Sequence, residues 1–179
     1  MSNFTRCRRS VTAYSPAASK LLGRDYWTLL DTIEYHVGYS DSNIVVIVPS
    51  GYITDGIFGA EWFQKHFPVT GKLSKAFIIH DYLYHYQRAL VNGSPSTISL
   101  KDADKILNEA LQVLGVGKVK ACLLTLAIGV IRKRSKRPNL ELKTKVEKVL
   151  GMLLTAGKSH DIDVELLKYY CKEHLVSST

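Results

Sequence analysis

Residues 76–90, AFIIHDYLYHYQRAL, place a histidine, an aspartate and several tyrosines inside an apolar stretch. A core helix needs none of these polar atoms, and a surface helix would not surround them with large apolar residues. An α-helix turns by about 100° per residue, so His80, Tyr84 and Phe77 share one face, and Asp81 shares an overlapping face with Tyr84. The stretch therefore predicts a helix that carries a polar functional site.

His80 and Asp81 are adjacent, so their side chains diverge and can serve different partners. An imidazole can take a proton from water, and a carboxylate can hold a hard cation that polarises a carbonyl group. Such a base needs an acceptor that orients its other ring nitrogen. Asp104, on the next predicted helix, is the candidate, and we expect its carboxylate within hydrogen-bond reach of His80, ~2.6–3.2 Å. Tyr84, one turn from His80, is a candidate to hydrogen-bond the same carboxylate.

The surrounding sequence predicts two consecutive helices that pack antiparallel. We expect one long helix over residues 72–93, ended by its Asn-Gly pair, and a loop over 94–99. The next helix covers residues 99–117, where Ser99 and Asp102 have the spacing of a capping box. Its apolar residues form a stripe of helical period at Leu100, Ala103, Ile106, Leu107, Ala110, Leu111 and Leu114.

The chain upstream of this helix pair predicts strands. Residues 25–38 and 44–56 are rich in aromatic and β-branched residues and flank the turn sequence SDSN at 40–43. Pro49 and the glycine two residues later favour a tight turn. Residues 55–71 form a glycine-containing loop of the size that is usually functional. The fold class is therefore α+β, a small N-terminal antiparallel β region followed by a mostly helical bundle.

Three further helices are predicted downstream. Residues 118–137 are apolar almost all round, so we expect that helix to be buried or to pack on a partner. Residues 140–157 and 161–175 form two amphipathic helices. The predicted organisation is an irregular N-terminal arm at 1–24, a core domain with the helix pair at 25–134 and a helical extension at 135–179.

The formal net charge of +8 comes from 24 Lys and Arg against 16 Asp and Glu. A basic protein favours polyanions such as nucleic acid or an anionic membrane surface. The run RKRSKR at 132–137 is the densest cluster, and taken alone it is better explained by a solvated basic face that aids solubility. The three cysteines, Cys7, Cys122 and Cys171, are far apart and form no C-x-x-C pair. Their spacing argues against a disulfide framework or a zinc ribbon and favours a reducing compartment.

The helix pair resembles the phospholipase A2 fold. HDYLY at 80–84 is similar to the H-D-x-x-Y signature, and KDADKIL at 101–107 is similar to the A-D-x-x-[FIL] segment of its partner helix, which the parvovirus capsid version also has. The resemblance implies that His80 is the general base, that Asp81 binds calcium and that Asp104 orients the histidine. The secreted enzymes of that family flank the histidine with cysteines, which this chain lacks.

The same resemblance implies that an upstream loop binds calcium through backbone carbonyls. That loop falls within residues 51–59, GYITDGIFG, with Gly51 and Gly56 as its glycines. Asp55 is an additional carboxylate that could complete a metal site with Asp81 and His80, or cap a turn after Thr54 instead. The loop lacks the Y-G-x-x-C-G-x-G-G pattern of the secreted enzymes.

Residues 25–130 are also similar to a family of small phage-encoded proteins of unknown function. Its motifs P-x-G-[FY]-x-T-D, H-D-x-L-Y and A-D before an apolar helix occur here in order, at 49–55, 80–84 and 103–116. The resemblance implies a phage protein, associated with the virion, whose partners are other virion proteins. Residues 1–20 lack the apolar core of a secretory signal, and the longest apolar stretch is shorter than the ~20 residues of a transmembrane helix. The expected location is therefore the virion or the host cytoplasm.

Three functions remain open from the sequence. In the first, the site hydrolyses or binds lipid as the phage enters its host, with calcium as cofactor. In the second, the protein is a non-enzymatic virion component in which the His/Asp cluster is a buried polar network that fixes helix pairing. In the third, His66 joins His80 and Asp81 in a metal-dependent phosphohydrolase. His85 points away from the face of His80 and is expected at the surface.

Overall fold

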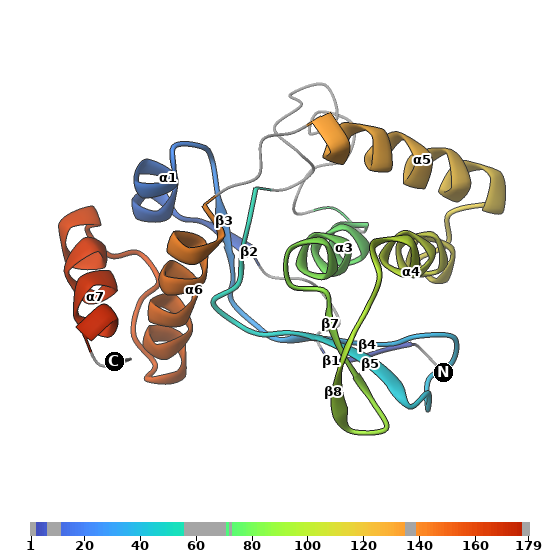
Figure 1. The fold of residues 1–179 in the computed structure, drawn as a ribbon, viewed down its shortest axis with the longest axis horizontal. Helices are drawn as coiled ribbons and strands as arrows, with labels where there is room; N and C mark the ends of the chain where they lie inside the picture. The colour runs from blue at the N-terminus through green and yellow to red at the C-terminus, as the bar shows by residue number, and fades with distance from the viewer. Residues whose placement is uncertain (1–2, 7–11, 56–70, 72, 135–138, 177–179) are drawn as a thin grey trace. The chain divides into compact units, whose positions relative to one another are not determined.

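The fold is α+β, as predicted, with antiparallel sheets and a largely helical remainder (Figure 1). The computed structural model describes residues 3–6, 12–55, 71, 73–134 and 139–176. The chain forms two compact units, each assembled from segments that are distant in sequence. This division differs from the predicted arm, core and extension, because strands pair with partners that a reading along the chain cannot identify.

Among the residues that the structure describes, the first unit contains a five-stranded antiparallel sheet and three helices. The strand order is β1-β4-β5-β7-β8, and α3 packs against the sheet, α4 against α3 and α5 against α4 (Figure 1). The elements are β1 (Phe4–Arg6), β4 (Ile33–His36), β5 (Ile44–Val48), α3 (Ser74–Tyr86), β7 (Arg88–Val91), β8 (Ser94–Thr97), α4 (Leu100–Val113) and α5 (Lys118–Arg134).

The predicted strand pair around residues 40–43 is confirmed as β4 and β5. Ile33 lies opposite Val48, and Tyr35 lies opposite Val46. All four side chains are fully buried, because alternate residues of a strand point to the same face of the sheet. β5 ends at Val48, immediately before the proline, which has no N–H group to donate to a neighbouring strand.

The prediction of one helix over residues 72–93 is wrong after Tyr86. α3 ends at Tyr86, where Gln87 adopts a left-handed conformation with φ 51°. The chain then forms the hairpin β7–β8, whose turn residues Asn92 and Gly93 also have positive φ. Asn-Gly is the preferred sequence for a two-residue hairpin turn with positive φ at both positions. The segment 94–99, predicted as a loop, supplies β8, and β7 pairs with β5.

The second helix of the pair begins as predicted. Ser99 caps α4 by accepting a hydrogen bond from the backbone N–H of Asp102 at 3.1 Å. The predicted apolar stripe supplies the buried face, which consists of Ala103, Ile106, Leu107, Ala110 and Leu111. α5, predicted to be buried or to pack on a partner, has one buried face, and its opposite face is exposed. No helix of the described chain is both long and apolar enough to cross a membrane.

In its described part, the second unit combines a three-stranded antiparallel sheet with three helices. Part of the predicted arm, β2 and α1, belongs to it, and its core joins α1 to the two C-terminal helices (Figure 1). The elements are β2 (Thr12–Tyr14), α1 (Pro16–Leu22), β3 (Trp27–Leu29), β6 (Ile53–Thr54), α6 (Leu140–Thr155) and α7 (Val164–Val176), with strand order β2-β3-β6. The core contains Ala17, Ala18, Tyr26, Ile53, Val146, Val149, Leu150, Leu167 and Cys171.

A buried lysine connects α6 to β6 in this unit. Lys143 is fully buried, and its Nζ lies 3.0 Å from Glu147 Oε1 and 4.2 Å from the centre of the Tyr52 ring. Glu147 Oε1 also accepts a hydrogen bond from the backbone N–H of Ile53 at 3.1 Å. The charge of the lysine is thus compensated inside the protein, which is the condition under which lysine is found buried.

Tyr35 and Glu109 join the sheet of the first unit to α4. The Tyr35 hydroxyl donates a 2.5 Å hydrogen bond to Glu109 Oε1, which also accepts the backbone N–H of Gly38 at 2.7 Å. Burial, and then the Glu109 carboxylate, raise the pKa of Tyr35 strongly. An unfolded tyrosine ionises near pH ~10, whereas this folded one stays protonated, so this contribution to stability is complete below pH ~10 and is lost as pH rises.

We expect Tyr35→Phe to flatten the alkaline pH dependence of folding. In the wild-type protein, Tyr35 should lower the free energy of unfolding by up to ~1.4 kcal/mol per pH unit above pH ~10. Urea denaturation at a series of pH values on both sides of pH ~10 measures this slope. Tyr39→Phe is the control, because Tyr39 is exposed and should leave the slope unchanged. Equal slopes for wild type and Tyr35→Phe would refute the assignment.

Candidate functional site

The middle of α3 places His80 and Asp81 in the interior of the first unit. His80 is fully buried, and Asp81 is 1% exposed. The helix is buried on all sides here because the sheet and α4 both pack against it. The buried residues are Ser74, Lys75, Ala76, Phe77, Ile78, Ile79, His80, Asp81 and Leu83. Two polar side chains in such surroundings need polar partners inside the protein.

The predicted contact between His80 and Asp104 is confirmed. His80 Nε2 lies 2.8 Å from Asp104 Oδ1, across the interface of α3 and α4. The backbone N–H of Ile98 donates to Gln87 O at 2.8 Å, so the hairpin returns the chain to the end of α3 before α4 begins. His80 and Asp104, which lie several residues away from this junction, are also in contact, so α3 and α4 run antiparallel.

This geometry assigns different roles to the two ring nitrogens of His80. An ionised carboxylate can only accept hydrogen bonds, so Nε2 carries a proton and donates a hydrogen bond to Asp104 Oδ1. In the neutral ring Nδ1 is then the basic nitrogen, and this atom is buried. The Asp104 side chain is 41% exposed, whereas that of His80 is 1% exposed. The carboxylate therefore forms the outer side of the pair and the imidazole the inner side.

Tyr84 and α5 lie next to the His80–Asp104 pair. The ring of Tyr84, predicted as a third member of the site, is 6.0 Å from the ring of His80 and tilted by 41°. A Cβ atom added at Gly129 of α5 would lie 3.9 Å from Asp104 Oδ2. The pair is thus positioned by three helices of one unit.

His85 is a residue of this region whose place the sequence analysis did not identify. Its side chain is only 8% exposed, and Nδ1 lies 3.5 Å from Asp81 Oδ1. The expectation of a surface histidine is wrong, because residues four apart on a helix are neighbours and Asp81 is buried. The spacing of four residues between Asp81 and His85 is the feature of the sequence that indicates this contact. α3 thus takes part in two histidine–aspartate contacts, His80–Asp104 and Asp81–His85.

The described residues predicted to complete a metal site belong to the second unit, whereas His80 and Asp81 belong to the first. Asp55 belongs to the second unit, where its Oδ2 lies 3.0 Å from Arg24 Nη1. Gly51 belongs to the same unit, whereas Gly56 and His66 lie outside the described residues. In the parts of the chain that the structure describes, no three His, Cys, Asp or Glu side chains are grouped so that they could hold a metal ion.

Gly51 has a structural requirement of its own. Its φ is +85°, and its N–H donates to Leu29 O at 2.8 Å. A Cβ atom at this position would lie 2.3 Å from the backbone nitrogen of Gly151 on α6. Only glycine fits both the conformation and this close approach of two backbones. Its occurrence in the motif at 49–55 thus has an explanation that involves no metal.

The arrangement of His80 and Asp104 allows two kinds of behaviour. A histidine oriented by a carboxylate can act as a general base when water or a hydroxyl group reaches its second nitrogen. The same contact can instead satisfy two polar groups at a helix interface and fix how α3 and α4 pair. The carboxylate of Asp81, held near His85, is a further charge-bearing group on α3.

Comparison with known proteins gives one match. No curated protein and no solved structure matches the chain. The model of a family described as "Protein of unknown function (DUF1353)" matches residues 27–128, which include α3, α4 and most of the first-unit sheet. This match covers more than half of the 179 residues, so the chain belongs to the DUF1353 family of proteins of unknown function.

Proposed function

We propose that the chain is a phage-encoded, virion-associated protein whose His80–Asp104 pair serves a phospholipase A2-like hydrolysis of lipid as the phage enters its host. The observation that supports this proposal is the 2.8 Å contact between His80 Nε2 and Asp104 Oδ1 on an antiparallel helix pair. The contact leaves Nδ1 as the nitrogen that takes up a proton. The motifs HDYLY and KDADKIL, which resemble those of phospholipase A2, supply exactly these two side chains.

The proposed reaction begins with a water molecule beside Nδ1 of His80. As the water oxygen bonds to the ester carbonyl carbon, Nδ1 takes its proton, and the Asp104 carboxylate stabilises the resulting imidazolium. The bond between that carbon and the alcohol oxygen then breaks. The proton passes from His80 to the leaving oxygen, so one water yields one fatty acid and one lysolipid. Because Nδ1 is buried, the ring must become accessible when lipid binds.

The proposed cofactor is calcium, with Asp81 as its side-chain ligand. Carboxylate and backbone oxygens are the ligands that calcium prefers, and the cation would polarise the ester carbonyl. Asp81 is adjacent to the proposed base, which is the arrangement that the resemblance implies for the metal ligand. Its contact with His85 at 3.5 Å is long for a hydrogen bond.

We expect millimolar calcium to raise the melting temperature of the wild-type protein and Asp81→Asn to abolish that rise. Binding to the folded state alone stabilises it, and for a chain of this size ~1 kcal/mol corresponds to ~2–4 °C. Differential scanning fluorimetry with calcium and with chelator measures the increment, and magnesium and zinc test selectivity. Asp41→Asn is the control, because Asp41 is exposed and lies in a turn. An unchanged wild-type melting temperature in calcium would remove calcium from the proposal.

The burial of His80 favours a second candidate function. The imidazole of His80 is fully buried, and its partner carboxylate faces solvent. This arrangement is expected of a polar contact that fixes how two helices pair. In that case the protein is a non-enzymatic virion component, and other virion proteins are its partners. The two candidates differ in one measurement, because only the hydrolase releases fatty acid.

A further inference from the structure

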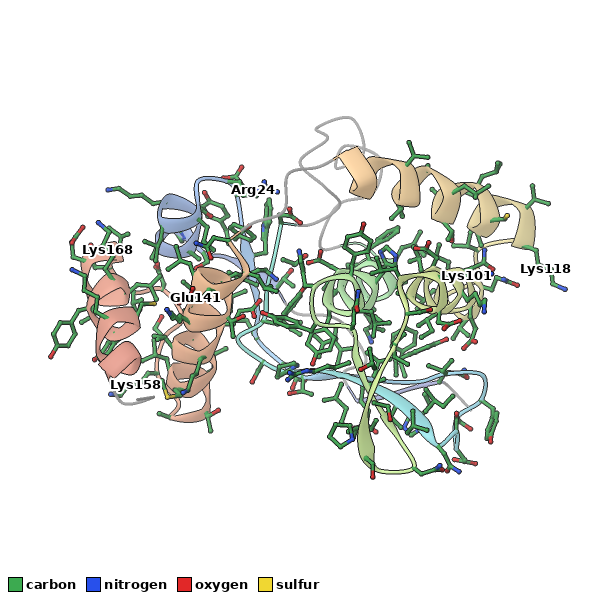
Figure 2. The ribbon with its side chains drawn as sticks, viewed as in Figure 1. Arg24, Lys101, Lys118, Glu141, Lys158 and Lys168 are labelled. Atoms are coloured by element: carbon green, nitrogen blue, oxygen red, sulfur yellow. The ribbon has the colours of Figure 1, made fainter. Side chains whose placement is uncertain are left out.

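α5 presents a continuous apolar stripe to solvent. Val119, Leu123, Leu126 and Val130 are 76%, 62%, 62% and 51% exposed. Their spacing of four, three and four residues places them on one face of the helix. The opposite face, with Ala121, Leu124, Thr125 and Ile128, is buried, and α5 packs on α4. Figure 2 shows side chains on the outer side of α5 projecting away from α3 and α4.

The charges of α5 have one sign and lie at its two ends. The helix sequence, KVKACLLTLAIGVIRKR, contains no aspartate or glutamate. Lys118 and Lys120 are exposed at its start, and Lys118 extends away from the helix in Figure 2. Arg132, Lys133 and Arg134 follow the stripe in the sequence. A solvent-facing apolar row between two groups of cations is the pattern of a helix that lies in the headgroup region of an anionic membrane.

A second copy of the chain fits this surface less well. Pairing α5 with α5 of another copy, in either direction, would bring together helices that carry only positive charge. A folded protein partner also fits poorly, because standard interfaces involve about 20–30 residues a side, whereas the stripe is one row of four large side chains on a convex helix. A membrane accepts protruding apolar side chains without a complementary pocket, and its anionic headgroups complement the cations at both ends.

We infer that the exposed face of α5 docks the protein onto an anionic lipid surface, with the helix lying in the plane of the interface. α5 packs on α4, and Gly129 is close to Asp104, so docking would hold the His80–Asp104 pair near the lipid surface, behind α5. In that last respect the inference rests on the proposed function. The docking itself involves no reaction and is measured separately.

Sedimentation with sucrose-loaded vesicles tests the inference. We expect the full chain to bind vesicles made of equal parts of phosphatidylglycerol and phosphatidylcholine, and to bind pure phosphatidylcholine at least tenfold more weakly. Binding should weaken as salt is raised, because salt screens the attraction of lysine and arginine to the headgroups. The variant L123Q/L126Q should bind the mixed vesicles at least tenfold more weakly than wild type. Both leucines are well exposed, so we expect the variant to fold and verify it by thermal unfolding.

The variant L140Q/L166Q is the matched control. Leu140 and Leu166 are 41% and 42% exposed, on α6 and α7, and the same chemical change there should alter vesicle binding less than twofold. Equal binding by wild type and L123Q/L126Q would overturn the inference, as would failure of the wild type to bind the mixed vesicles. Loss of a wild-type dimer in L123Q/L126Q, seen by sedimentation velocity without lipid, would assign the stripe to a second copy instead. Vesicle binding without fatty acid release would overturn the hydrolase and support the docking surface.

Discussion

Substitution of His80 by glutamine is expected to abolish lipid hydrolysis while the protein still folds. General base catalysis contributes ~10²–10⁴-fold to the rate, and glutamine has no group that takes up a proton near neutral pH. Its side-chain amide can still donate to the Asp104 carboxylate, so the contact between α3 and α4 can be retained. Release of fatty acid from mixed anionic vesicles, with calcium and with chelator, measures the activity, and thermal unfolding measures the fold.

His36→Gln is the control for this substitution. His36 also contacts a carboxylate in the first unit, with Nε2 3.0 Å from Glu34 Oε1, but it lies on β4 and outside the proposed site. It should therefore leave fatty acid release unchanged. If His80→Gln released fatty acid at the wild-type rate, His80 would not be the base. If wild type and variant both stayed at background, the pair would be a structural contact that fixes how α3 and α4 pair.

Features set by neighbouring residues could be predicted from the sequence. The cap of α4 depends on Ser99 and Asp102, and the buried faces of β4 and α4 follow from the periods of their apolar residues. The contact of His80 with Asp104 was also predictable. It needs only two adjacent helices that run antiparallel, with each polar residue on the apolar side of its helix.

Features that depend on distant segments could not be predicted. Residues 88–97 become a hairpin because β7 pairs with β5, and no local period reveals that pairing. The assembly of α1 with α6 and α7 joins the two ends of the chain around one core. α5 is apolar almost all round, so its sequence does not indicate which face α4 covers. His85 was missed because its partner Asp81 was considered only as a metal ligand.

Gly51 shows that a residue of a sequence motif can have a structural role. We expect its substitution by alanine to destabilise the protein more than the same change at other glycines of the second unit. Alanine at a positive φ costs ~1–2 kcal/mol. Here its Cβ would also lie 2.3 Å from Gly151 N and 2.5 Å from Gly151 Cα, and both are backbone atoms that no side-chain rotation can move away. Overpacking of this kind adds ~1–3 kcal/mol. We therefore expect Gly51→Ala to lower the free energy of unfolding by ~2–5 kcal/mol in total.

Gly23→Ala separates the two contributions. Gly23 has a similar φ of +76° and belongs to the same unit, but no atom lies within 4 Å of the Cβ position. It should lose only the ~1–2 kcal/mol of the backbone conformation. Urea denaturation of both variants measures the difference, which is the contribution of the close approach between residues 51 and 151. Equal losses would show that α6 does not pack this closely on the turn.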